Sequence, residues 1–159
     1  MQKGDINKEP MDINELAQDV LASAQLDGCD GFDSVLDLGH DLPMVLANRI
    51  QVQRILNNLI RNGIEAARAS GMPCESIMIR VKTAVEHGMA QVTIQDNGPG
   101  IDADMNDEVF KPFFTTKPHG IGMGLAVSDA LAKANGGCLW VDQGGSPGAT
   151  FHLALPFSS

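Results

Sequence analysis

The chain has 159 residues, of which 43% are apolar and 19% charged, and its formal net charge is −9. This length and composition fit one globular domain with a real hydrophobic core. The negative charge argues against nucleic acid as a partner, since a polyanion-binding protein needs concentrated positive groups.

No apolar run approaches transmembrane length and no signal-peptide pattern is visible, so we expect no membrane contact by this domain. The three cysteines, Cys29, Cys74 and Cys138, are odd in number and widely spaced. That spacing argues against a disulfide framework and a metal cluster, and predicts a reducing, cytoplasmic location.

Residues 1–10 are polar, and we expect them to form a frayed linker or tail. A helix is then predicted from Met11, with Asp12 as its N-cap and Glu15 three positions later. Two short strands, 32–38 and 42–46, should follow a glycine-containing turn and be joined at 39–41. The apolar residues at helical spacing are Ile13, Leu16, Ala17, Val20, Leu21 and Ala24.

The longest helical pattern runs over 48–70 and stops at Gly71 and Pro73. Asn58, Asn62 and Glu65 share one stripe of this helix, because they are spaced i, i+4 and i+7. Asparagine prefers caps and turns, so two of them in mid-helix indicate either a ligand site or a solvated polar face. The predicted buried face comprises Ile50, Ile55, Leu56, Leu59, Ile60, Gly63, Ile64 and Ala67.

Alternating β-branched residues predict a hairpin of two strands, 76–84 and 89–95, with a turn at 86–88. The second strand delivers Asp96 just before Gly98 and Gly100. A carboxylate in this place is suited either to accept a hydrogen bond from a ligand amine or only to cap the turn.

The passage from Asp96 to Leu125 has two glycine clusters around a long segment without periodicity, which favours a functional lid over a linker. Phe110, Phe113 and Phe114 support the lid, because linkers seldom carry aromatic residues. The second cluster, 120–124, opens a helix over 125–135, a typical phosphate-binding arrangement; the alternative is a flexible glycine-rich helix entry.

A final strand pair is expected over 138–142 and 149–155. Helices interleaved with hairpins predict an α+β, two-layer α/β sandwich with helices on one face of a mixed sheet, rather than a doubly wound fold.

Taken together, the motifs resemble the ATP-binding catalytic domain of bacterial sensor histidine kinases, a superfamily that also holds gyrase, Hsp90 and MutL ATPases. The resemblance covers 11–157 and rests on an N box (58–66), a first glycine box (96–101), an F box (109–117), a second glycine box (120–125) and a closing Gly148-Ala149-Thr150-Phe151. It implies the Bergerat ATP-binding fold. The endings of the N and F boxes resemble the nitrogen- and oxygen-sensing branch.

The resemblance implies a role for each box. Asn62 would ligate Mg²⁺ with support from Asn58, and Asp96 would accept a hydrogen bond from the adenine amino group. Lys117 would neutralise phosphate charge from the lid, and Thr150 would line the adenine end. The remaining nucleotide contacts would come from Glu65, Ala66, Gly98, Gly100, Ile101, Gly120, Ile121, Gly122, Met123, Gly124 and Leu125.

Three residues depart from the family pattern. Gly63 stands where the family usually has alanine, and Lys111 replaces a common glutamate. Glu65 stands where many relatives have a lysine that contacts phosphate. Lys117 and Arg61 would therefore have to supply the positive charge near the phosphates.

The expected function is therefore Mg-ATP binding and phosphoryl donation to a histidine in a separate dimerisation domain, with a response regulator as indirect partner. No acceptor-histidine motif is present in the sequence, so we expect an excised, monomeric catalytic domain that does not phosphorylate itself. The alternatives are an anti-sigma-type protein-serine kinase, another ATPase of the superfamily, or a docking domain without nucleotide binding.

Overall fold

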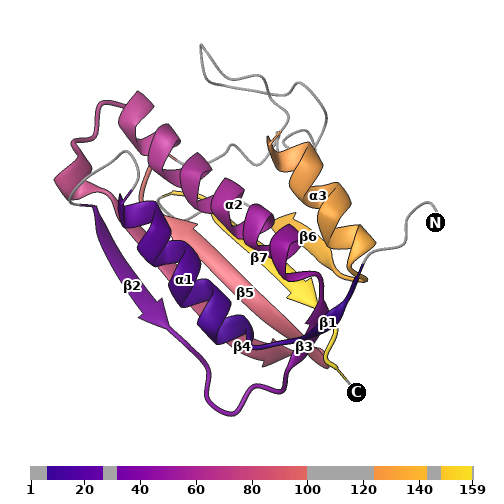
Figure 1. The fold of residues 1–159 in the computed structure, drawn as a ribbon. Helices are drawn as coiled ribbons and strands as arrows, with labels where there is room; N and C mark the ends of the chain where they lie inside the picture. Colours follow the sequence, from indigo (N-terminus) through magenta and orange to yellow (C-terminus); the bar gives the residue numbers. More distant parts are fainter. Residues whose placement is uncertain (1–6, 27–31, 100–123, 143–147, 159) are drawn as a thin grey trace.

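The computed structural model describes residues 7–26, 32–99, 124–142 and 148–158, and the statements below concern these ranges. Figure 1 shows the elements as one layer of helices on one layer of strands. In chain order they are β1 (Glu9–Met11), α1 (Ile13–Leu26), β2 (Asp33–Asp37), β3 (Val45–Ala47), α2 (Arg49–Ala69), a short 3-10 helix (Cys74–Ser76), β4 (Met78–Glu86), β5 (Met89–Asp96), α3 (Gly124–Ala134), β6 (Cys138–Val141) and β7 (Thr150–Leu155).

The main sheet has five strands in the order β2-β4-β5-β7-β6. Only the β2–β4 pair is parallel, and the other three pairs are antiparallel. The three helices cover one face of this sheet (Figure 1). The predicted two-layer sandwich with a mixed, mostly antiparallel sheet is confirmed.

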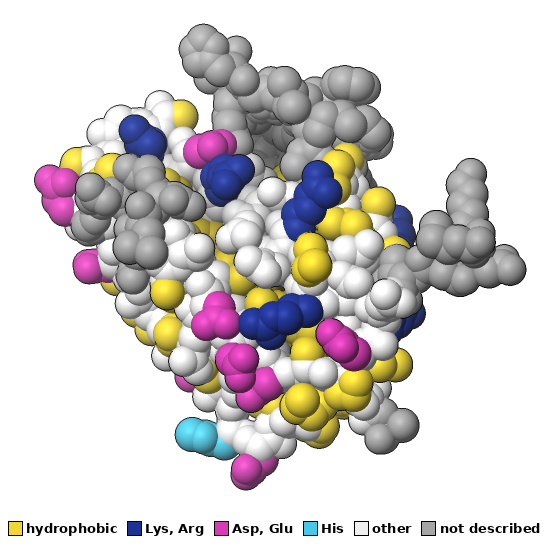
Figure 2. Space-filling view, viewed as in Figure 1, with side chains coloured by type: hydrophobic (Ala, Val, Ile, Leu, Met, Phe, Trp, Pro, Cys, Tyr) yellow, Lys and Arg dark blue, Asp and Glu magenta, His cyan; other side chains and the backbone are white. Residues whose placement is uncertain are grey.

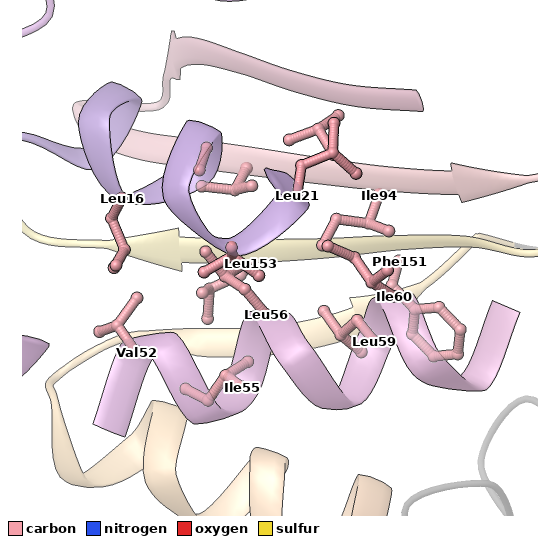
Figure 3. Close-up of a cluster of buried hydrophobic side chains, with 14 of the residues drawn as sticks. Leu16, Leu21, Val52, Ile55, Leu56, Leu59, Ile60, Ile94, Phe151 and Leu153 are labelled. Atoms are coloured by element: carbon pink, nitrogen blue, oxygen red, sulfur yellow. The ribbon is translucent and has the colours of Figure 1, made fainter. Parts of the chain in front are cut away.

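Side chains of the central strands alternate between the two faces of the sheet. Ile79 and Val81 on β4 are buried under the helices, whereas Arg80 and Lys82, which alternate with them, are exposed. This period of two is the pattern that predicted the strands. Figure 3 shows the resulting core, in which Leu56, Leu59 and Ile60 of α2 face Ile94, Phe151 and Leu153 of the sheet.

Helix α2 forms where the apolar periodicity predicts it and has a cap at each end. The side chain of Asn48 accepts a hydrogen bond from the Gln51 N–H at 3.0 Å, which satisfies one of the unpaired donors of the first turn. Gly71 follows the helix with φ of +93°, a conformation that glycine adopts without strain. Ile50 corrects the predicted buried face, because its side chain is 76% exposed beside the N-terminus of the helix.

The hairpin of β4 and β5 is also confirmed. Its turn has positive φ at His87 (54°) and Gly88 (75°), the combination that suits a two-residue hairpin loop. The register continues to the far end of the pair, where Asp96 lies opposite Ile79. The turn chemistry thereby fixes where Asp96 stands.

The N-terminal region departs from the sequence prediction in two places. The frayed tail was expected to reach residue 10, but β1 pairs Glu9 with Ala47 and Met11 with Val45 of β3. The strands predicted at 32–38 and 42–46 do not pair with each other, since β2 joins the main sheet and β3 joins β1. The Asp12 cap of α1 is confirmed, because its Oδ1 accepts from the Asn14 and Glu15 N–H groups at 2.9 and 3.2 Å.

The cysteines give a mixed outcome. Cys74 is disulfide-bonded, which corrects the expectation drawn from cysteine spacing, whereas Cys138 is free and exposed. In the described part of the chain, no helix has the length and apolar character needed to cross a membrane.

Two isoleucines of α2 give a matched test of the packing. Ile55 is fully buried, and Ile55→Ala should lower the free energy of unfolding by about 2–5 kcal/mol through lost contacts and a cavity. Ile50→Ala removes the same atoms from an exposed position and should change it by less than about 0.5 kcal/mol. Urea unfolding of both variants measures the difference, and equal losses would contradict the described orientation of α2.

Candidate nucleotide-binding site

Asp96 ends strand β5 and is only 7% exposed. Its Oδ1 accepts hydrogen bonds from the N–H of Gly98 at 2.9 Å and of Ala149 at 3.3 Å. The backbone adds a further link, because the Asp96 N–H donates to the Ala149 carbonyl at 3.0 Å. One carboxylate oxygen is therefore committed to the protein at the junction of β5 and β7.

Burial has an electrostatic consequence for this carboxyl. Removal from water raises the pKa of Asp96 above its ordinary value, and the N–H groups of Gly98 and Ala149 counteract only part of that rise. A buried carboxyl with few protein partners is the kind of group that meets a ligand, because a protein seldom buries one for stability alone.

Asn97 anchors the chain directly after this carboxyl. Its Oδ1 accepts from the Met78 N–H at 2.8 Å, and its Nδ2 donates to the Ser76 carbonyl at 2.9 Å. These two bonds tie the end of β5 to the start of β4, and they hold the turn in which Gly98 points its N–H at Asp96.

Two glycines, Gly63 and Gly148, allow the backbone to come close to Asp96. A Cβ atom on Gly63 of α2 would lie 2.9 Å from the Asp96 Cβ and 3.0 Å from its Oδ2. Gly148 has φ of +81°, and a side chain there would run into the Asp96 carbonyl. Glycine at both positions therefore lets α2 and the start of β7 close around the carboxylate.

The polar stripe of α2 lies between this carboxylate and α3. Asn58, Asn62 and Ala66 are half-buried, and Glu65 is exposed. The Asn58 Nδ2 donates to the Oγ of Ser128, a fully buried residue of α3, at 3.0 Å. The solvated-face alternative therefore does not apply to Asn58, which joins the two helices.

Helix α3 begins at Gly124 and Leu125, as the second glycine box predicts, and Leu125 packs against the core. The first turn of a helix leaves backbone N–H groups without helical partners and carries the positive end of the helix dipole. The start of α3 is thus a suitable place for an anionic group.

Several predicted site residues lie outside the described residues, so the structure gives no account of them. They are Gly100, Ile101, Lys117, Gly120, Ile121, Gly122 and Met123, together with the F-box phenylalanines. Arg61 is described and exposed on α2 beside Asn62. Figure 2 shows Lys and Arg side chains spread over this helical face despite the negative net charge.

Thr150 differs from the other predicted residues in its surroundings. It lies opposite Gln95, while the neighbouring pair Phe151 and Ile94 is buried towards the helices. Because side chains alternate along a strand, Thr150 points to the face away from Asp96, and its adenine role stays a prediction. The residue that contacts the carboxylate is its neighbour Ala149, through the backbone.

The sequence analysis did not predict the contacts of Ala149 and Ser128, nor the close approach of Gly63 to Asp96. A backbone N–H has no sequence signature, and a buried serine on an apolar helix face looks like ordinary packing. Gly63 did give a signal, since glycine in mid-helix is unfavourable and departs from the family pattern.

The side chains of the candidate site determine which kind of metal ion it could bind. Within the described ranges, no group of three or more His, Cys, Asp or Glu side chains is placed to hold a metal ion. Mg²⁺ needs few protein ligands, because it keeps several waters and takes phosphate oxygens. The amide of Asn58, which reaches Ser128 of α3, and the amide of Asn62, one turn further along α2, fit that mode of binding.

Comparison with known proteins agrees with this geometry. Residues 47–159 match the model of the family described as "Histidine kinase-, DNA gyrase B-, and HSP90-like ATPase". The sensor protein FixL of Bradyrhizobium diazoefficiens is 40% identical over 121 residues, which are 76% of this chain and 23% of that protein. The chain thus spans about a quarter of the length of this relative.

Solved structures place the fold in the same group. The catalytic domain of the histidine kinase ThkA is 25% identical with a TM-score of 0.79, and the match covers 95% of this chain and 96% of that one. Full-length ShkA in complex with AMPPNP is 25% identical with a TM-score of 0.83, over 98% of this chain and 32% of that one.

The raised pKa of Asp96 predicts a pH-dependent effect of Asp96→Asn on stability. Because the folded state binds this proton more tightly, the contribution of Asp96 is fully present below its unfolded pKa and is lost as pH rises through its folded pKa. Asparagine does not titrate, so the stability of Asp96→Asn relative to the native chain should increase with pH over that window and then level off.

Chemical unfolding of both chains at a series of pH values measures this difference. Asp37→Asn, which removes an exposed carboxyl on β2, controls for the loss of one negative charge. A difference that is independent of pH, or that matches the control, would contradict the effect of burial on Asp96.

Proposed function

The chain belongs to the family of histidine kinase-, DNA gyrase B- and HSP90-like ATPases, and from this premise we propose that it is the ATP-binding catalytic domain of a sensor histidine kinase. The observation that supports this most directly is the buried Asp96 carboxylate at the end of β5, beside the asparagine stripe of α2 and the start of α3. The name of a similar solved structure, the catalytic domain of the histidine kinase ThkA, supports the histidine-kinase assignment over the serine-kinase alternative.

Adenine recognition would rest on Asp96. Its Oδ1 accepts from two backbone N–H donors, so Oδ2 would be the oxygen that accepts a hydrogen bond from the adenine amino group. Guanine presents a carbonyl at the same ring position, which would place two acceptors face to face. A buried, charged acceptor therefore selects adenine both by attraction and by repulsion.

The phosphates would lie towards the start of α3. There the helix N–H groups and the helix dipole favour negative charge. Asn62, supported by Asn58, would hold Mg²⁺, which supplies charge neutralisation between the phosphate groups. Lys117 and Arg61 would add positive charge, and Gly100, Ile101, Gly120, Ile121, Gly122 and Met123 would complete the contacts.

The chemical step would move the γ-phosphoryl group of ATP to an imidazole nitrogen of a histidine, with ADP as the leaving product. Such transfer depends mainly on positioning and charge stabilisation, which this domain would provide. The histidine would belong to a dimerisation domain joined to the catalytic domain through residues that precede β1, and a response regulator would receive the group later. We expect this to occur in the cytoplasm and the separate domain to be a monomer.

Calorimetric titration with ADP and Mg²⁺ tests the site. The two N–H donors at Oδ1 should orient the amide of Asp96→Asn so that its NH₂ faces the adenine amino group. Loss of a charged hydrogen bond, about 1.5–3 kcal/mol, should therefore weaken ADP binding by about 10- to 100-fold. Asn62→Ala should remove the Mg²⁺-dependent part of the affinity.

The control for both variants is Asn57→Ala, a half-buried neighbour on α2 outside the predicted stripe, which should keep native affinity. If Asp96→Asn and Asn62→Ala also keep native affinity, the site is assigned to the wrong residues.

The phosphoryl acceptor is tested separately by mixing this chain, radiolabelled ATP and Mg²⁺ with the histidine-bearing dimerisation domain of the parent kinase. The label should enter that domain in an acid-labile, alkali-stable bond, and this chain alone should stay unlabelled. Label in an acid-stable bond would instead favour the anti-sigma-type serine kinase.

A further inference from the structure

Helix α2 carries four of the five arginines of the chain and a single acidic residue, Glu65. The chain as a whole has a net charge of −9, so this helix is a local concentration of positive charge. Three of the arginines, Arg54, Arg61 and Arg68, are exposed and are called the arginine row below. Figure 2 shows Lys and Arg side chains over α2 on this face of the molecule.

The members of the arginine row lie nearly in line along the helix. They are seven residues apart, and because seven residues make almost two full turns, successive side chains drift by only about 20°. At a rise of about 1.5 Å per residue, the side chains start about 10 Å apart and the row spans about 21 Å. The row lies on the solvent side of α2, away from the buried face that includes Ile55 and Leu59.

Ion pairing within the domain does not account for the arginine row. Arg49, at the start of the same helix, donates a hydrogen bond to the Asp19 Oδ2 at 3.0 Å and lies 4.0 Å from the Glu15 Oε1. Within the part of the chain that the structure describes, the guanidinium groups of the arginine row make no ion pair and no hydrogen bond. Their charges are therefore available to a partner.

The spacing of the arginine row selects among anionic partners. A second α-helix laid along α2 presents side chains seven residues apart at the same interval of about 10 Å, with the same drift. Its carboxylates can each take two parallel N–H donors from one guanidinium group. A nucleic-acid duplex or an anionic membrane presents a continuous negative surface instead, which the exposed Glu65 and the net charge of −9 oppose.

We propose that the arginine row is a docking surface for an acidic α-helix of a partner protein, which carries carboxylates at seven-residue spacing. The partner helix lies along α2 at a small crossing angle, with one carboxylate on each arginine. Exposed pairs of this kind set register and speed association more than they add affinity, so the complex is weak and sensitive to salt. The inference does not depend on the proposed nucleotide site.

The test is an NMR titration of the native chain with two synthetic helical peptides of the same composition, which differ only in the spacing of three glutamates. In the first peptide the glutamates are seven residues apart, and in the second they are five apart and face different sides. The first peptide should shift amide signals of α2 and bind at least about threefold more tightly. Equal affinity for the two peptides would overturn the proposal, because the contact would then depend on net charge alone.

A pair of double variants tests the residues. Arg54→Gln/Arg68→Gln leaves Arg61, which has a proposed role near the phosphates, and should weaken binding of the first peptide by about five- to tenfold. Arg80→Gln/Lys82→Gln removes the same charge from exposed positions on β4 and should keep native affinity. All four positions are exposed, so both variants should fold, and a thermal melt checks this. Equal losses in the two variants would contradict the proposed surface.

Charge reversal and other anions complete the test. Arg54→Glu/Arg68→Glu should lose the first peptide and gain a peptide whose two outer glutamates are replaced by lysines, and no such gain would count against direct pairing. Vesicles of phosphatidylcholine with phosphatidylserine and a short DNA duplex are titrated in parallel. If either binds the native chain more tightly than the first peptide, and Arg54→Gln/Arg68→Gln weakens it, the acidic-helix partner is wrong.

Discussion

The burial of one carboxylate, that of Asp96, constrains three separate elements at once. Because a charged oxygen out of water needs donors, the chain after β5 must turn so that Gly98 presents its N–H, and β7 must begin where Ala149 presents another. The carboxylate also fills space, and α2 approaches it most closely at Gly63, where a Cβ atom would lie 2.9 Å from the Asp96 Cβ. Charge and volume together therefore place the end of the hairpin, the start of β7 and the middle of α2.

Asparagine amides link the helices that flank this centre. At one end Asn58 of α2 reaches Ser128 of α3. At the other end the fully buried Asn135 accepts from the Asn48 N–H at 2.8 Å and donates to the Gln51 Oε1 at 3.0 Å. The cap of α2 and the end of α3 are thus one hydrogen-bonded unit, and the spacing between the helices does not depend on apolar packing alone.

The periodic spacing of apolar residues predicted most of the helices and strands. The features that it did not predict have physical causes. The apolar repeat of α2 and the His87-Gly88 turn are local signals, so α2 and the β4–β5 hairpin follow from them. Pairing of β1 with β3 brings together residues some 35 positions apart, which no local pattern encodes. Ile50 fits the helical repeat but lies in the first turn of α2, where its side chain is 76% exposed. Asp96, Asn58 and Asn62 could be named from their side-chain chemistry, and their roles stay predictions, whereas Ala149 and Ser128 contribute a backbone group and a packed hydroxyl that no sequence pattern indicates.

The β1–β3 ribbon has a mechanical consequence for anything joined to this domain. Strand β3 pairs with β1 and also receives the C-terminal segment, through the Leu46 N–H to the Pro156 carbonyl and the Ser158 N–H to the Met44 carbonyl. A tether at residue 7 and a tether at residue 158 would therefore pull on the same three-residue strand. In Figure 1 this strand and the start of α3 lie at different ends of the molecule. Rotation about such a common hinge would sweep the start of α3 through a wide arc while leaving the hinge strand almost in place.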